Sequence, residues 1–332
     1  MRLRRSDCNR PGFTRRRAGK GFTYLDEHGR RLGPEERVRI AALAIPPAWT
    51  DVWISPDDRG HIQATGIDAA GRRQYRYHDA WRANQDNAKF DAALQFARLL
   101  PRIRTRVQKD LARRPSDGPD RDQALALAIR MLDLGLFRIG GEAYADMNGS
   151  YGLATLEKSH VSVDGKRVSF DYPAKSGQRR HSSMTDARAA ALVKTLLQRR
   201  GGGRELLAYR QDGSWRDVVT ADINGWLKEI AGEDVTAKTF RTWHATVLAA
   251  VGLAAADATS TRAGRKRVVN SVVKEVAHEL GNTPAVARKS YIDPRVLDRY
   301  GAGETIKLTR ADNLDDPAAR HRIERRVVKL LS

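Results

Sequence analysis

The chain has 332 residues, of which 41% are hydrophobic and 30% charged; it is long enough for two folded domains and too apolar for an intrinsically disordered protein. Its 60 lysines and arginines outnumber its 40 aspartates and glutamates, giving a formal net charge of +20. A single cysteine, Cys8, excludes an internal disulfide framework and a multi-cysteine zinc site, and no apolar run is long enough to span a membrane. The basic N-terminus lacks the apolar segment of a secretory signal, so we expect a cytoplasmic protein.

The positive charge favours a polyanionic partner, with nucleic acid as the leading candidate. Basic residues are spread along the whole chain rather than gathered in one tail, which favours a protein that surrounds its partner. An arginine-rich proteome from a GC-rich genome would produce the same excess, so charge alone does not decide between the two.

The first 80 or so residues have the pattern of strands and turns. Turn-forming clusters at 27–29, 56–60 and 68–71 separate short runs of aromatic and β-branched residues. Residues 33–45, "GPEERVRIAALAI", have a helical pattern that Pro46 and Pro47 stop. This region therefore predicts a small α+β domain built on an antiparallel sheet.

From about residue 79 the pattern becomes helical, with Asp79 as a plausible N-cap. Apolar residues recur at helical spacing, and many of these runs follow a capping residue or end at a glycine. They predict helices at 79–100, 121–137, 185–203, 220–232, 236–256, 260–282, 284–291 and 315–331. We expect the caps to be serine or threonine in most of these, including Thr185 and Thr283.

One small sheet is expected inside this helical region. Alternating strand residues flank Asp164-Gly165, a strong hairpin dipeptide, and a second turn follows at 173–178. The predicted fold class is thus α+β: an antiparallel β-sheet domain at 1–88 and a larger, mainly α-helical domain with a small sheet at 89–332.

Two common classes of site are missing from the sequence. It has neither a GxxxxGK[ST] phosphate loop nor a dinucleotide fingerprint after a strand. Its eight histidines form no HExxH motif and no tight ligand set with carboxylates. We therefore expect no cofactor and no metal site.

Five polar residues that lie near predicted helix ends or in a predicted turn are candidates for a functional site instead. Arg138 follows an apolar helix beside two glycines, Lys175 lies in a hairpin turn, and Arg241 lies early in an apolar helix. Asn282 follows a glycine at a helix end, and Tyr291 lies near the end of the short helix after it. Each has an ordinary structural explanation when taken alone: a solvated cation, an ion pair, a C-cap amide or a packing aromatic.

Taken together, the five have the chemistry of phosphoryl transfer to a tyrosine. Guanidinium groups match the non-bridging oxygens of a phosphate, and an amide adds a neutral donor. A lysine whose pKa is lowered by neighbouring cations can protonate the leaving oxygen. The same cations favour the phenolate, since free tyrosine has a pKa near 10 and is a weak nucleophile at neutral pH.

The order of these residues resembles that of the type IB DNA topoisomerases, in particular the small poxvirus-like enzymes of bacteria. The resemblance extends over nearly the whole chain. It is carried by "FRIGGEAY", by the hairpins up to "PAKSGQRRH", by "TAKTFRTWHAT", by "ELGNTPAVARKSYIDP" and, near the N-terminus, by "QATGIDAAGRRQYRYH".

The resemblance implies a role for each residue. Tyr291 would attack a DNA phosphodiester and form a 3′-phosphotyrosyl bond, while Lys175 with Arg138 would protonate the 5′ oxygen. Arg138, Arg241 and Asn282 would bind the non-bridging oxygens. Positions that match DNA contacts in the family are Lys238, Tyr144, Gln74, Tyr75 and Tyr77, whose alternative is ordinary sheet or helix packing.

The resemblance also implies relaxation of supercoils without ATP or metal, by a monomer that closes around double-stranded DNA as a C-shaped clamp in the nucleoid. One residue departs from the family, because the viral and nuclear enzymes have histidine where this chain has Asn282. An amide can still donate a hydrogen bond but cannot become charged, so we expect a working site with altered pH dependence.

Two other functions remain open. A tyrosine recombinase or integrase shares the fold and the order of the residues, but its second arginine usually lies in HxxR, and here Lys238 is three residues before Arg241. A non-catalytic basic DNA-binding protein explains the charge equally well but not the five residues.

One geometric expectation follows for the last motif. Asn282 and Tyr291 are nine residues apart, about two and a half helical turns, so they would not share one helix face. They can meet at one phosphate only through the bend that Thr283-Pro284 introduces.

Overall fold

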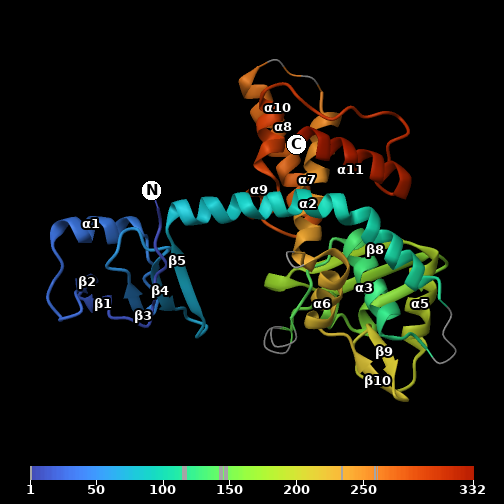
Figure 1. Ribbon diagram of the computed structural model, residues 1–332, viewed down its shortest axis with the longest axis horizontal. Helices are drawn as coiled ribbons and strands as arrows, with labels where there is room; N and C mark the ends of the chain where they lie inside the picture. Colours follow the sequence, from blue (N-terminus) through green and yellow to red (C-terminus); the bar gives the residue numbers. More distant parts are fainter. Residues whose placement is uncertain are drawn as a thin grey trace. The chain divides into compact units, whose positions relative to one another are not determined.

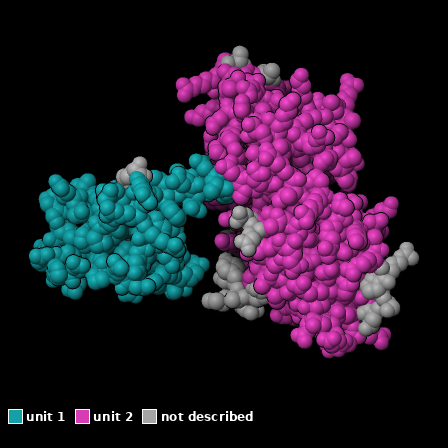
Figure 2. All heavy atoms as spheres, in the orientation of Figure 1, with its two compact units in different colours: residues 1–89 teal, residues 90–332 magenta. Residues whose placement is uncertain are grey.

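The computed structural model describes residues 2–113, 118–141, 145, 149–232, 235–257, 259 and 261–332. The chain divides into two compact units, residues 1–89 and 90–332, coloured separately in Figure 2. None of the described helices is long and apolar enough to cross a membrane.

The first unit contains a five-stranded antiparallel sheet and one helix. The strands β1 (Phe13–Ala18), β2 (Gly21–Leu25), β3 (Thr50–Ile54), β4 (Ile62–Ile67) and β5 (Arg73–Tyr77) are arranged in the order β2-β1-β3-β4-β5. Helix α1 (Pro34–Ala42) buries Ile40 against Val52, Ile54 and Ala64 of the sheet. The α+β character expected for this region is confirmed (Figure 1).

Helix α2 (Asp79–Leu111) is longer than expected, because it continues through Pro101. A proline inside a helix removes one backbone hydrogen bond and costs about 3 kcal/mol. Leu100, Ile103 and Val107 are all buried, so the apolar face continues past the proline and offsets that cost. Asp79 is the first residue of the helix rather than its N-cap. The division between the two units falls inside α2, between residues 89 and 90.

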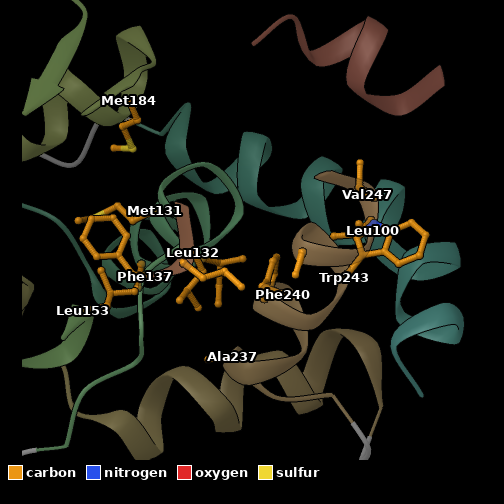
Figure 3. Packing of buried hydrophobic residues seen from close by; sticks show 14 of the residues in the cluster. Leu100, Met131, Leu132, Phe137, Leu153, Met184, Ala237, Phe240, Trp243 and Val247 are labelled. Carbon is orange, nitrogen blue, oxygen red and sulfur yellow. The ribbon is translucent and has the colours of Figure 1, made fainter. Parts of the chain in front are cut away.

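The second unit is mainly helical. Its helices are α3 (Arg121–Gly135), α5 (Ala187–Gln198), α6 (Thr220–Ala231), α7 (Ala237–Ala255), α8 (Arg262–Leu280), α9 (Pro284–Ser290), α10 (Pro294–Gly301) and α11 (Pro317–Leu331). Helix α7 contacts α3, α6, α8, α10 and α11. It therefore lies at the centre of the unit, and its side chains Phe240, Trp243 and Val247 belong to the large core shown in part in Figure 3.

The expected hairpin is present and forms part of a three-stranded sheet. Strand β6 (Val161–Asp164) pairs with β7 (Arg167–Pro173), and β7 pairs with β8 (Arg179–Thr185), all antiparallel. A short turn of 3₁₀-helix, η3 (Lys175–Gly177), connects β7 to β8. Two further turns of this kind, η1 (Leu153–Thr155) and η2 (Lys158–His160), precede the sheet.

Two elements of this unit were missed in the sequence analysis, and the caps of two helices were misplaced. A second sheet, the hairpin of β9 (Ala208–Gln211) and β10 (Ser214–Asp217), was not predicted, and neither was α10. The cap of α5 is Asp186 rather than Thr185, because the Asp186 carboxylate accepts from two backbone N–H groups. Helix α6 has Val219 rather than Thr220 at its cap position, and the Val219 backbone N–H donates to the Asp222 side chain at 3.2 Å.

A buried ionic network joins four helices behind the core. Arg104 of α2 donates to both carboxylate oxygens of Asp133 in α3, at 2.8 and 2.9 Å, and to Glu324 in α11. His244 of α7 lies 3.4 Å from Asp133. Burial is the largest single influence on the pKa of Asp133 and raises it, but Arg104 and His244 together outweigh burial and hold that pKa well below its usual value. The network ties the helices that carry the candidate site to one another.

Candidate active site

The candidate site begins where α3 ends. The helix terminates at Leu136, which adopts a left-handed conformation with φ of 54°, and the chain then turns away from the helix axis. Phe137 is buried beside Leu153 and packs edge-to-face on Phe170 of β7, so the next residue, Arg138, is held at a fixed place (Figure 3). The backbone carbonyl of Arg138 accepts from Leu153 N–H at 2.8 Å, which further fixes this segment.

The backbone two residues after Arg138 requires a glycine, Gly140. Its φ is 84°, and a Cβ at this residue would lie 3.0 Å from the Cα of Gly152. A side chain here would therefore be both strained and too close to a neighbouring backbone. The two glycines let the Arg138 loop and the segment before η1 approach closely.

The guanidinium groups of Arg138 and Arg241 converge on the C-terminal end of α8. Arg138 Nη2 donates to Gly281 O at 2.7 Å and also to Asn282 Oδ1. Arg241 Nη2 donates to Leu280 O at 2.8 Å. Gly281 adopts φ of 58°, the left-handed C-cap that turns the chain so that Asn282 faces Arg138.

Arg241 is only 4% exposed and is held by backbone carbonyls rather than by a carboxylate. Its Nη1 donates to Leu136 O, at the end of α3, in addition to the Nη2 contact with α8. Burial lowers the pKa of Arg241 to about 10, while Tyr291 acts in the opposite direction. The guanidinium thus remains charged near neutral pH and links three elements.

Tyr291 lies at the end of α9, next to Arg241. Helix α9 begins with Thr283 as N-cap and Pro284 as its first residue, and Tyr291 is its C-cap. The Arg241 Cζ atom is 5.2 Å from the centroid of the Tyr291 ring. The structure therefore brings Arg138, Arg241, Asn282 and Tyr291 together, with the Thr283-Pro284 bend between the last two.

Two buried donors in this cluster have no hydrogen-bond partner among the described residues. They are the side-chain nitrogen Nδ2 of Asn282 and the Nε of Arg241. The orientation of the Asn282 amide is fixed by its hydrogen bond with Arg138, because only Oδ1 can accept from the guanidinium and Nδ2 must then be the unpaired atom. Most buried polar groups in folded proteins are paired, so two unpaired donors on residues that both contact the C-terminal end of α8 are typical of a binding site for an anion.

The turn that carries Lys175 borders this cluster through Ala174 and Gln178. Lys175 itself is exposed in η3, and its neighbour Ala174 lines a pocket of about 570 Å³ together with Arg138, Gly281 and Asn282. The turn that carries Lys175 is closed by a 2.7 Å hydrogen bond from Ala174 N–H to Gln178 O.

Four of the remaining predicted residues lie in the described part of the chain. Lys238 is exposed in the first turn of α7. In the first unit Tyr75 and Tyr77 are 41% and 37% exposed and stack at 5.9 Å, while the Gln74 amide donates to Asp68. Tyr144 lies outside the described residues.

Two side chains near the cluster were missed by the sequence analysis. Thr246 Oγ1 accepts from Asp293 N–H at 3.1 Å, and its one proton is shared between Thr242 O at 2.9 Å and Tyr291 O at 3.3 Å. It therefore holds the backbone that follows Tyr291 against α7. Arg180 of β8 bonds two carbonyls at the end of α8. A hydroxyl within an apolar helix and a double arginine after the Lys175 turn were the signals available in the sequence.

Comparison with known proteins identifies the family. Residues 78–311 match the family model described as the catalytic core of eukaryotic DNA topoisomerase I, and residues 21–68 match the N-terminal domain of bacterial DNA topoisomerase IB. The chain belongs to the type IB DNA topoisomerases. It is thus an isomerase that acts on DNA, as the sequence predicted.

One curated relative and two solved structures give the degree of similarity. The DNA topoisomerase 1B of Acanthamoeba polyphaga mimivirus is 28% identical over 298 residues, covering 87% of each chain. Two structures of the XerH site-specific recombinase bound to difH DNA align with TM-scores of 0.38 and 0.37 at 14% and 13% identity. These alignments cover 62% and 61% of this topoisomerase, which spans about half of each recombinase chain, 52% and 48%.

The described residues contain no group of three or more histidine, cysteine, aspartate or glutamate side chains arranged to hold a metal ion. The polar atoms of the candidate site are instead guanidinium, amide and phenol groups, which interact with anions rather than cations.

Proposed function

We propose that this topoisomerase relaxes supercoiled double-stranded DNA by cutting one strand, holding it as a 3′-phosphotyrosyl bond at Tyr291, and rejoining it. The observation that carries the proposal is the pair of buried, unpaired donors, Asn282 Nδ2 and Arg241 Nε. Leaving a buried donor unsatisfied costs about 1–3 kcal/mol. The two non-bridging oxygens of a phosphodiester would satisfy both donors at once.

The proposed cleavage step is an in-line displacement at phosphorus. The phenol oxygen of Tyr291 forms a bond to phosphorus and its proton passes to water, while the bond from phosphorus to the 5′ oxygen breaks. Lys175, assisted by Arg138, gives a proton to that oxygen, so a free 5′-hydroxyl results. Arg138, Arg241 and Asn282 stabilise the charge that develops on the non-bridging oxygens.

Rejoining reverses these steps. The 5′-hydroxyl attacks the phosphotyrosine after the cut strand has rotated about the intact one, and Tyr291 leaves. Because the phosphotyrosyl bond conserves the energy of the original phosphodiester, we propose that neither ATP nor a metal ion is required.

The first unit supplies further DNA contacts in this proposal. Residues 1–88 would act as a DNA-binding domain through Gln74, Tyr75 and Tyr77, and residues 89–332 as the catalytic domain, with Lys238 near the cut. Tyr144, six residues after Arg138 in the sequence, would add a contact. We propose that a monomer closes around the duplex as a C-shaped clamp, and that the enzyme works in the cytoplasm on nucleoid DNA.

Relaxation of a negatively supercoiled plasmid with EDTA present and ATP absent tests the proposal. The wild-type chain should relax the plasmid, and Tyr291→Phe should not, while the control Tyr24→Phe in the first unit should behave as wild type. On a duplex whose cut strand is labelled at its 5′ end, denaturation should trap a labelled covalent adduct with wild type only, because Tyr291 stays on the 3′ phosphate of the upstream fragment. Equal relaxation by wild type and Tyr291→Phe would eliminate Tyr291 as the nucleophile.

The same experiment separates the two alternatives. A recombinase would exchange strands between two DNA sites and would not relax a single plasmid. A non-catalytic DNA-binding protein would bind the plasmid, give no covalent adduct and leave its supercoiling unchanged once removed.

A further inference from the structure

The last three carbonyls of α8 and that of its C-cap, Gly281, each accept a hydrogen bond from an arginine. Arg180 donates to His278 O at 3.3 Å and to Glu279 O, Arg241 donates to Leu280 O, and Arg138 donates to Gly281 O. Helix C-termini leave four such carbonyls without helical partners and carry partial negative charge. Three guanidinium groups from three different elements therefore neutralise the end of α8.

Arg180 differs from the other two arginines because of the element that carries it. It lies in β8, opposite Tyr172 of β7, at the base of the turn that holds Lys175. Residues 174 and 178 close that turn by a backbone hydrogen bond. The Arg180 side chain thus connects the Lys175 turn directly to the helix end that is followed by Asn282.

We propose that Arg180 is a positioning residue, which docks the Lys175 turn against the Asn282 end of α8. This inference rests on the proposed function, in which Lys175 protonates the leaving oxygen and Asn282 binds a non-bridging oxygen. Both groups must reach the same phosphate, and they come from segments about 100 residues apart. The contacts of Arg180 with His278 O and Glu279 O fix the one segment relative to the other.

Arg179 provides a matched control for the loss of one positive charge. It precedes Arg180 in β8, so its side chain points to the opposite face of the sheet. There it forms a bidentate ion pair with Asp171, at 2.6 and 3.0 Å. Arg179→Gln and Arg180→Gln therefore lower the net charge equally, but only the second removes the contact with α8.

The first arm of the experiment separates cleavage from binding. Single-turnover cleavage of a short duplex by excess protein should be about 10- to 100-fold slower for Arg180→Gln, the loss expected when a catalytic group is misplaced by about 1 Å. The Kd for the duplex should change less than about threefold, and equally for Arg179→Gln, which should cleave at the wild-type rate. Equal cleavage rates for the two variants would overturn the proposal.

The second arm asks whether the defect acts through Lys175. In a duplex whose bridging 5′ oxygen is replaced by sulfur, the leaving thiolate needs no proton, because a thiol has a pKa near 8.5. The Arg180→Gln defect should shrink to less than about threefold on this duplex. A defect that stays as large as on the oxygen duplex would overturn docking of the Lys175 turn.

Lys175→Ala on the same two duplexes tests the proposed function separately. Its defect should also disappear with the sulfur duplex; if it persists there, Lys175 is not the general acid, and the first arm alone decides on Arg180. Arg180→Lys, which can still reach one carbonyl, should cleave at a rate between Arg180→Gln and wild type. If thermal melting shows that Arg180→Gln is unfolded, the cleavage rates of Arg180→Lys on the two duplexes are compared with wild type in its place.

Discussion

Removal of the Asn282 amide should reduce DNA cleavage strongly while leaving the fold intact. The Nδ2 atom is buried, has no partner among the described residues, and is oriented by the bond from Arg138 to Oδ1. One donor to the charge of the transition state contributes about 2.7–4 kcal/mol in comparable sites. We therefore expect Asn282→Ala to slow single-turnover cleavage by about 100- to 1,000-fold.

The stability of Asn282→Ala should differ little from that of wild type. The substitution removes an unsatisfied buried donor, which favours folding, and leaves Arg138 without one acceptor, which opposes it. Chemical denaturation should show a change of less than about 1 kcal/mol in the free energy of unfolding. Asn313→Ala, at an exposed asparagine, serves as the control for both measurements.

A second variant, Asn282→His, introduces the histidine of the family and should differ from wild type in the pH dependence of cleavage. Asn282→His should keep a donor at this position and add a titrating imidazole, whose pKa in water lies near 6.5, so its cleavage rate should change with pH in that region. Asn282 itself has no proton to gain or lose there. The reasoning fails if Asn282→Ala cleaves within about threefold of wild type under single-turnover conditions.

Three further predictions concern residues that support the site. Arg104→Met removes the cation that pairs with two buried carboxylates, Glu324 and Asp133, of which Asp133 keeps longer contacts with His244 at 3.4 Å and Arg130 at 3.8 Å. It should lower the free energy of unfolding by about 3–5 kcal/mol in urea, whereas the exposed control Arg102→Met should change it little. Burial lowers the pKa of His244, so its imidazole binds a proton more readily in the unfolded chain, and the free energy of unfolding should fall as pH drops below about 6.5. His244→Gln should remove this part of the pH dependence. The loss of stability that protonation of Asp133 causes below about pH 4 should remain. Thr246→Val should slow DNA cleavage about tenfold and leave the Kd for DNA unchanged. Thr246→Ser, which keeps the hydroxyl, should cleave at the wild-type rate. Equal cleavage rates for the two variants would show that the hydroxyl does not position the nucleophile.

The elements that were predicted correctly depend on short-range signals. The hairpin at Asp164-Gly165 requires a particular turn, and α9 begins at Thr283-Pro284 because a cap and a first-position proline specify a helix start locally. The strands of the first unit are bounded by turn residues for the same reason. Helix α2 did not end at Pro101, since the burial of its far half is a property of the folded core and not of the local sequence.

The sequence by itself established a strongly basic chain and predicted the chemistry of the candidate site, from a tyrosine, two arginines, a lysine and an amide whose order resembles that of the type IB topoisomerases. The tertiary structure decided what each of these side chains touches. It placed the arginines on the carbonyls at the end of α8, left Asn282 Nδ2 and Arg241 Nε without partners among the described residues, and joined Arg180 to the same helix end. Residue type and spacing fix which hydrogen bonds are possible, but burial and pairing depend on contacts between segments about 100 residues apart, which only the packed fold specifies.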